Sequence, residues 1–257
     1  MLPALDWAQP WFAPWRDPGE AVAARVAAGR PLHQALNASS PPVRFVPQDQ
    51  LPASTSYEQF IFDTGMCPVR PGLHDFFNGL CWLRFPETKR ALNWLQAQEL
   101  ARQGVGPRRG PVRDAITVFD ENGALLDAPE PLWEALRARD WRRLFVDLRP
   151  LWAQACLLVF GHALLEKLVV PRKDLTAHVW VPASAMDSRA DIDGWLSRQC
   201  TSGVLASKPF TPLPVLGLPG WDPGNENFSF YDDSLVFRSR HTREQQNSGT
   251  EPPRAGP

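Results

Sequence analysis

Proline is the feature of this sequence that most restricts how the chain can fold. There are 27 prolines among 257 residues, and they occur along the whole length. Because proline fixes φ and cannot donate a backbone hydrogen bond, it interrupts both helices and strands. We therefore expect short elements joined by long, stiffened connections. The 11 tryptophans, spread from Trp7 to Trp221, are expected to anchor these connections to the core.

The length of the chain suits one large domain or two small ones. Residues 1–19 predict a Trp/Pro-rich N-terminal arm that lies over the fold. Residues 20–238 predict a single globular domain, because no segment within them has the composition of a linker. Residues 239–257 are polar and are predicted to form a disordered tail.

Apolar periodicity predicts an α+β fold in which helices outnumber strands. The helices are expected at 19–29, 30–38, on either side of Pro86 within 71–104, and at 130–138, 140–147 and 191–200. A small β-sheet is expected from a hairpin near 112–127, with "DENG" as its turn, and a strand near 175–181. A short strand is expected at 43–47, and residues 56–65 fit a strand or an edge segment.

The segment 149–169 is predicted to be a buried helix at the centre of the domain, because its apolar residues cover nearly every direction. Within "FGHALLEK", His162 and Glu166 are one turn apart and share a face with Ala155 and Val159. Lys167 is near the helix end, so its long side chain can reach the surface. Burying an unpaired charge is costly, so His162 and Glu166 need partners. A satisfied core pair would explain these two residues equally well.

A second polar group lies in "HDFFNGLCWL". On a helix, His74, Asn78 and Trp82 share one side and Asp75 is next to them, which suggests a lined cavity. The simpler alternative is that Asp75 favours the helix dipole and Asn78 is exposed.

Weaker candidates follow along the chain. Lys89 and Asn93 share a helix face, which an ordinary amphipathic helix also explains. In the predicted strand, alternation sends either Arg113 or Asp114 inward. His178 lies in a strand where a polar residue is unexpected, although a lone strand histidine is more often structural.

Composition argues against several classes of protein. The net charge of −1 favours neither nucleic acid nor an anionic membrane as a partner. The longest uncharged run is too short to span a bilayer, and the N-terminus has no basic region typical of a signal peptide. The four cysteines form no C-x-x-C pair, which is typical of free thiols. A reducing cytoplasm is the simplest compartment.

Longer stretches resemble a known family. The motifs are "PVRPGLHDFFNGLCWLRFPETKRALN", "RDAITVFDENGAL", "FGHALLEKLVVPRKDLTAH" and "LPVLGLPGWDPGNENFSFYDDSLVFR". They resemble bacterial proteins catalogued as domain of unknown function 3025 (DUF3025). The resemblance implies no activity, but it implies that the polar residues named above, from His74 to His178, belong to the family's own motifs. At "GWDPGN" the chain departs from the family pattern, because we expect a second aromatic residue after Trp221.

The leading hypothesis is an enzyme, most plausibly a hydrolase, with a buried acid–base site formed by His74, Asp75, His162 and Glu166. A small anionic substrate would be held by polar residues around this site, namely Asn78, Lys89, Asn93, Arg113, Lys167 and His178. A divalent metal ion bridged by histidine and carboxylate would let the same residues activate water. The alternative is a non-catalytic binding or scaffolding protein whose polar core is structural, with the N-terminal arm as its interaction surface. Neither hypothesis specifies an oligomeric state.

Overall fold

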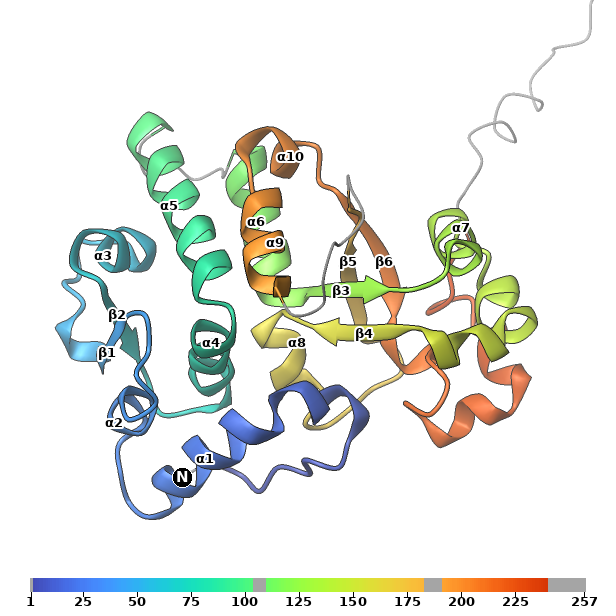
Figure 1. The fold of residues 1–257 in the computed structure, drawn as a ribbon, viewed down its shortest axis with the longest axis horizontal. Helices are drawn as coiled ribbons and strands as arrows, with labels where there is room; N and C mark the ends of the chain where they lie inside the picture. Colours follow the sequence, from blue (N-terminus) through green and yellow to red (C-terminus); the bar gives the residue numbers. More distant parts are fainter. Residues whose placement is uncertain (1, 104–109, 183–190, 240–257) are drawn as a thin grey trace, which may run out of the picture.

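A four-stranded mixed sheet and a two-stranded parallel sheet are surrounded by helices (Figure 1), so the fold is α+β as predicted. The structure, a computed structural model, describes residues 2–103, 110–182 and 191–239. Its α-helices are α1 (Arg16–Ala27), α2 (Leu32–Asn37), α3 (Tyr57–Thr64), α4 (Leu73–Arg84), α5 (Pro86–Gln103), α6 (Pro111–Asn122), α7 (Glu130–Ala138), α8 (His162–Lys167), α9 (Ile192–Gln199) and α10 (Ser202–Ala206).

The larger sheet has the strand order β4-β3-β5-β6. Its strands are β3 (Gly123–Asp127), β4 (Cys156–Val159), β5 (Thr176–Trp180) and β6 (Phe210–Pro214). β3 is antiparallel to β4 and parallel to β5, and β6 returns antiparallel to β5. The smaller sheet pairs β1 (Arg44–Pro47) with β2 (Met66–Val69) in parallel. The strand predictions near 43–47 and 175–181 are therefore confirmed.

The predicted division at Pro86 is also confirmed. α4 ends at Arg84, and α5 begins with Pro86 at its first position, where proline's missing N–H has no helical partner to lose. The Asp193 carboxylate of α9 accepts hydrogen bonds from the backbone N–H groups of Glu87 and Thr88, both at 2.8 Å. This cap fixes α9 against the start of α5.

The predicted hairpin near 112–127 is wrong. Residues Pro111–Asn122 form α6, and only Gly123–Asp127 is a strand. Pro111 suits the first turn of a helix, and the buried residues Val112, Ile116 and Phe119 recur at helical spacing. This spacing outweighs the β-branched composition that suggested a strand. As a consequence, the "DENG" sequence is the end of a helix and the start of β3.

The predicted central helix over 149–169 is also wrong. The segment contains a 3₁₀-helix (Arg149–Gln154), the strand β4 and the short helix α8. A continuous apolar run fits a strand buried on both faces as well as a buried helix, so periodicity could not separate them. Gly161 makes the turn between β4 and α8, where an added Cβ would lie 2.5 Å from the backbone of Asn122. The expected face shared by His162, Glu166, Ala155 and Val159 therefore does not exist.

Residues 56–65 form a helix and not a strand. The Ser56 side chain accepts a hydrogen bond from the Gln59 N–H at the start of α3, and Gly65 ends the helix in the left-handed region at φ 66°. Both are common helix boundary signals. α3 packs on α5, which brings Tyr57 toward the centre of the fold.

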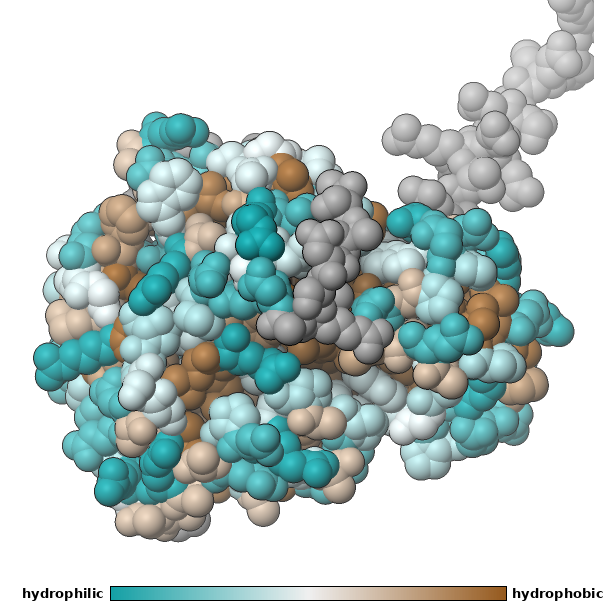
Figure 2. Space-filling model, in the orientation of Figure 1, coloured by the Kyte–Doolittle hydropathy of each residue, from teal (hydrophilic) through white to brown (hydrophobic). Residues whose placement is uncertain are grey.

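The aromatic residues of the N-terminal segment are part of the core. Trp11, Phe12 and Trp15 are buried in the same hydrophobic cluster as the sheet, and Trp15 Nε1 donates to the Val159 carbonyl of β4 at 3.1 Å. On the face shown in Figure 2, hydrophilic residues cover most of the surface. The predicted disordered tail, 239–257, lies outside the described residues except for Ser239. Within the described ranges, no helix combines the length and the apolar character needed to cross a membrane.

Candidate functional site

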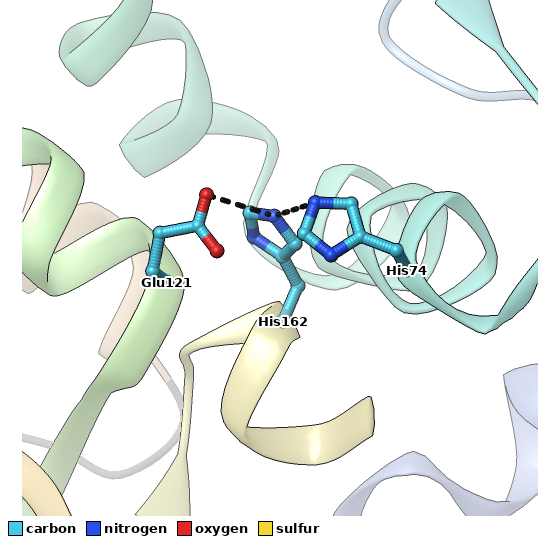
Figure 3. Close-up of side chains that lie close together, drawn as sticks. All are labelled: His74, Glu121 and His162. Atoms are coloured by element: carbon cyan, nitrogen blue, oxygen red, sulfur yellow. Dashed lines mark hydrogen bonds and ion pairs between the residues drawn. The ribbon is translucent and has the colours of Figure 1, made fainter. Parts of the chain in front are cut away.

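The two histidine motifs meet in space. His74 from α4 and His162 from α8 face each other with their Nε2 atoms 3.1 Å apart, and their rings are tilted by 73° (Figure 3). α4 packs directly on α8. Glu121 reaches the same point from α6, with its Oε1 3.7 Å from His162 Nε2. Three helices therefore bring together three groups that commonly bind metal ions.

Each of these side chains lies near the end of a helix. His74 is the second residue of α4, His162 is the first residue of α8, and Glu121 is the last but one of α6. The tight turn at Gly161 directs His162 toward α6, because the Gly161 N–H donates to the carbonyl of Gly123, just after α6, at 2.8 Å. The geometry of the site therefore depends on where these three helix ends lie, and the sheet helps to position them.

On their other side, both histidines face carboxylates. His74 Nδ1 is 3.0 Å from Glu166 Oε2, and His162 Nδ1 is 3.8 Å from Asp120 Oδ2. The second distance exceeds a hydrogen bond, and among the described residues His162 Nδ1 is a buried atom without a hydrogen-bond partner. Buried polar atoms are rarely left without a partner, so this one calls for an explanation.

The positions of the carboxylates restrict the proton positions on the rings. A proton on each Nδ1, directed at Glu166 and Asp120, leaves the lone pairs of both Nε2 atoms facing each other at 3.1 Å. Those lone pairs repel unless a cation lies between them. A proton on Nε2 of either histidine, which for His162 is simply the other neutral tautomer, or a metal ion bound by both atoms satisfies the arrangement. The pair can therefore hold either one shared proton or one metal ion between its Nε2 atoms.

Asp120 is held as a carboxylate by a buried lysine. Lys89 Nζ lies 2.6 Å from Asp120 Oδ1 and donates to Asn78 Oδ1 at 2.9 Å, and the lysine side chain is only 6 % exposed. Burial alone would raise the pKa of Asp120, but the positive charge of Lys89, joined by that of His162 when His162 is protonated, outweighs it and lowers that pKa. Asn78 in turn donates to the Tyr57 hydroxyl at 3.0 Å. The network keeps a negative charge beside His162.

Burial controls the protonation of His162 and Glu121. Desolvation lowers the pKa of His162 to about 4, even though Asp120 opposes this shift. Burial, and then the negative charge of Asp120, raises the pKa of Glu121. At neutral pH His162 is therefore a neutral imidazole, the form that binds metal ions.

These groups open into a cavity of about 300 Å³. Polar side chains dominate its wall, and they include Arg70, Asp75, Gln48, Gln96, Thr117 and Tyr57 as well as both histidines. A volume at the lower end of the range for ligand sites suits a small substrate. A further cavity of about 40 Å³, lined by Lys89 and Asn93, adjoins it at Tyr57 and Asp120.

Asp75 does not pair with a histidine, contrary to our expectation of an acid–base pair on one helix. Its carboxylate accepts hydrogen bonds from the Arg70 side chain, through Nε at 3.2 Å and Nη2 at 3.3 Å, and from the Arg70 backbone N–H. Glu166 is also differently placed, because it contacts His74 and not His162. Both carboxylates orient neighbouring groups.

The predicted substrate-binding residues divide into two groups. Asn78 lines the main cavity, and Lys89 and Asn93 line the small one. Outside both cavities are Lys167, which donates to Asn122 at 3.0 Å, and the half-buried His178 of β5. Arg113 is buried, while the half-exposed Asp114 pairs with Lys208, so one of the two charges points inward as predicted, but from the helix α6 and not from a strand.

Sequence reasoning missed four residues of the site, namely Tyr57, Arg70, Asp120 and Glu121. The prediction of a hairpin placed Asp120 and Glu121 in a turn, where acidic residues need no partner. The signal that could have found them is the helical spacing of Val112, Ile116 and Phe119, which extends α6 to these carboxylates.

The site lies within a region that a protein-family model matches. A family model described as "Protein of unknown function (DUF3025)" matches residues 43–241. The chain belongs to the DUF3025 family. The match includes His74, Glu121 and His162, and it confirms the resemblance seen in the sequence motifs. No curated protein and no solved structure matches this DUF3025 chain.

The three ligand-type atoms fit a single metal ion. One atom each from His74, Glu121 and His162 can be chosen so that all lie within 4.8 Å of one another. Two nitrogens bound to one ion at about 2.1 Å are roughly 3.0–3.4 Å apart for tetrahedral or octahedral angles, and the two Nε2 atoms are 3.1 Å apart. Glu166 is placed as the carboxylate that orients a metal-binding histidine.

Proposed function

We propose that this DUF3025 protein is a metal-dependent hydrolase whose ion is bound by His74, His162 and Glu121. The observation that carries the proposal is the approach of two imidazole Nε2 atoms to 3.1 Å, with a carboxylate oxygen beside them, at the wall of a polar cavity. Three protein ligands that leave further coordination positions open are typical of catalytic metal sites.

Each neighbouring residue has a distinct role in this proposal. Glu166 accepts the Nδ1 proton of His74, and the negative charge of Asp120, 3.8 Å from His162 Nδ1, favours a proton there, which would direct both Nε2 lone pairs toward the ion. Lys89 keeps Asp120 ionised. A bound divalent ion would lower the pKa of its water and so supply hydroxide near neutral pH. Polar donors such as Tyr57 and Asn78 would position the substrate in the cavity.

The test is hydrolysis of chromogenic esters by protein of defined metal content. We would assay 4-nitrophenyl acetate, 4-nitrophenyl phosphate and bis(4-nitrophenyl) phosphate after chelation and after return of zinc, manganese or iron(II). We expect turnover of at least one ester that chelation removes, that metal restores, and that falls at least a hundredfold in Glu121→Gln. The surface variant Glu134→Gln, whose side chain is 54 % exposed, is the control and should keep full activity.

The alternative, a structural polar core, makes the opposite prediction. In that case the metal-loaded protein turns over none of the three esters, and His74→Ala and His162→Ala both unfold the chain because they break a required pair. That pair of results would contradict the proposal.

A further inference from the structure

We infer that the substrate carries a carboxylate or phosphate group and that Arg70 binds this oxyanion within the cavity. The inference rests on the proposed function, because it supplies the substrate class for the metal-dependent reaction. Arg70 lies between β2 and α4 and lines the same 300 Å³ cavity as His74, His162 and Glu121. Among the described residues that line this cavity, Arg70 is the one lysine or arginine.

The cations expected from the sequence either have other partners or lie away from the cavity. Lys89 is buried between Asp120 and Asn78, and Lys167 is exposed and donates to Asn122. Arg113 lines neither the main cavity nor the small one beside it. An anion in the main cavity would therefore meet the guanidinium of Arg70, whose side chain is 63 % exposed.

Asp75 holds the guanidinium in a defined orientation. Its two carboxylate oxygens accept from Nε and Nη2 of Arg70, at 3.2 and 3.3 Å, and its side chain is 8 % exposed. This pairing uses one edge of the guanidinium. The second edge, formed by Nη1 and Nη2, can bind a second oxyanion with two parallel hydrogen bonds, a geometry in which lysine cannot replace arginine.

The surroundings of Arg70 are compatible with an anion. Lys89 offsets the charge of Asp120, and a divalent ion would offset that of Glu121. Asp75 is paired with Arg70 itself, and the Glu58 carboxylate accepts a hydrogen bond from Gln96 Nε2 at 3.3 Å. The rest of the wall is mainly amide and hydroxyl groups, including those of Gln48, Gln96 and Thr117. Such groups bind the uncharged part of a small polar molecule. The substrate class is thus a small polar ester or amide that carries one oxyanion.

The experiment measures binding of acetate and of inorganic phosphate by titration calorimetry at constant ionic strength, with chloride as the reference. Both anions are titrated into metal-loaded and chelated protein. We expect one of them to bind, and to bind about tenfold more weakly to Arg70→Met, as the loss of charge-assisted hydrogen bonds requires. Arg70→Lys, which keeps the charge but loses the fork, should also bind more weakly. The anion that responds identifies the group as carboxylate or phosphate.

Two variants serve as controls. Arg172→Met removes an exposed arginine that pairs with Asp174, and it should bind the anion as the wild type does. Arg70→Met/Asp75→Asn removes both charges of the pair, so it tests the role of Arg70 if the single variant does not fold. Anion binding that is unchanged in both Arg70 variants, or no binding of either anion to the wild type, would overturn the inference.

Titration with the metal alone separates this result from the proposed function. Metal binding should be unchanged in Arg70→Met, because Arg70 is not a ligand. If the metal does not bind the wild type, the proposed function fails, while Arg70-dependent anion binding by the chelated protein still tests the anion site.

Discussion

Two clusters of buried polar side chains in the described part of the structure differ in how completely their atoms are hydrogen-bonded. In the C-terminal cluster, Asn225 is fully buried and donates to the carbonyls of Leu216 and Leu218 at 2.9 and 2.6 Å, while Arg149 donates to its side-chain oxygen at 3.1 Å. In the histidine cluster, His162 Nδ1 is buried without a hydrogen-bond partner among the described residues.

The difference separates a structural network from a candidate reactive one. Tyr231 completes the C-terminal cluster by donating to the Gly217 carbonyl at 2.9 Å and accepting from Arg149 at 3.1 Å. That network ties together a proline-rich segment that forms few regular elements. The histidine cluster instead brings two imidazole Nε2 atoms within 3.1 Å of each other at the wall of a cavity and leaves His162 Nδ1 unpaired. A complete network stabilises the fold, whereas an incomplete one is arranged to bind something else.

The largest expected effect on stability is in the C-terminal cluster. Asn225→Leu leaves the Leu216 carbonyl without its partner, and it removes one hydrogen bond each from the Leu218 carbonyl and from Arg149, which keep other partners. A buried group left unpaired costs about 1–3 kcal/mol, and each further hydrogen bond lost costs about 1 kcal/mol. We expect the free energy of unfolding to fall by about 3 kcal/mol or more, measured by urea denaturation of the metal-free protein. A loss below about 1 kcal/mol would mean that this network is not structural, and the comparison would fail.

A fall in pH should lower the free energy of unfolding of the metal-free protein, because His162 in the histidine cluster resists protonation. The folded pKa of His162 is lowered from 6.5 to about 4, so between these values the unfolded chain binds a proton that the folded chain does not. Stability is therefore lost as the pH falls from about 6.5 to about 4, by about 3 kcal/mol. Urea unfolding at pH 7, 5.5 and 4.5 measures this loss. His162→Gln cannot bind the proton, so an equally steep decline in that variant would contradict the prediction.

We expect Lys89 to influence metal affinity indirectly, because it pairs with Asp120, which lies beside the ligand His162. Lys89→Met removes the charge that keeps Asp120 ionised, and loss of such outer interactions typically costs about tenfold to a hundredfold in metal affinity. Metal titration of the folded variant measures it. Because the variant leaves the half-buried Asp120 without its lysine partner, Lys89→Met/Asp120→Asn serves as a control that should fold and still bind metal weakly. Wild-type metal affinity in both variants would exclude a role of Lys89 in metal binding.

The smallest expected effect belongs to Glu166. Glu166→Gln keeps a hydrogen-bond acceptor for His74 Nδ1 but removes the negative charge, so metal affinity should fall by about tenfold. Both His74 and Glu166 side chains are 38 % exposed, which limits the electrostatic part of the effect. A larger loss of metal affinity than in Lys89→Met would contradict this prediction, because it would show that Glu166 matters more to metal binding than Asp120 does.

Local sequence signals predicted the parts of the fold that depend on them. Pro86 divided α4 from α5, and the alternation near His178 identified β5. The segments 112–127 and 149–169 were wrong because their structure depends on partners distant in sequence. β4 is a strand because it pairs with β3, and the same apolar letters would suit a buried helix.

The site was predictable to the same extent. His74, His162 and Glu166 were found because ionisable residues in apolar helices need partners, and the structure brings them together. Glu121 and Asp120 were missed because their helix was taken for a hairpin. Arg70 was missed because it lies in a short connection, where no periodicity indicates which way a side chain points.

The measurement that tests the account most directly is the metal content of the protein, by plasma mass spectrometry after purification without a chelator. We predict about one equivalent of a divalent metal in the wild type and in His33→Ala, which removes a histidine outside the site. The metal should be lost in His162→Ala and in Glu121→Gln. A wild-type protein that stays metal-free after supplementation with zinc, manganese and iron(II), or metal retained in both site variants, would contradict the assignment of His74, His162 and Glu121 as one metal site.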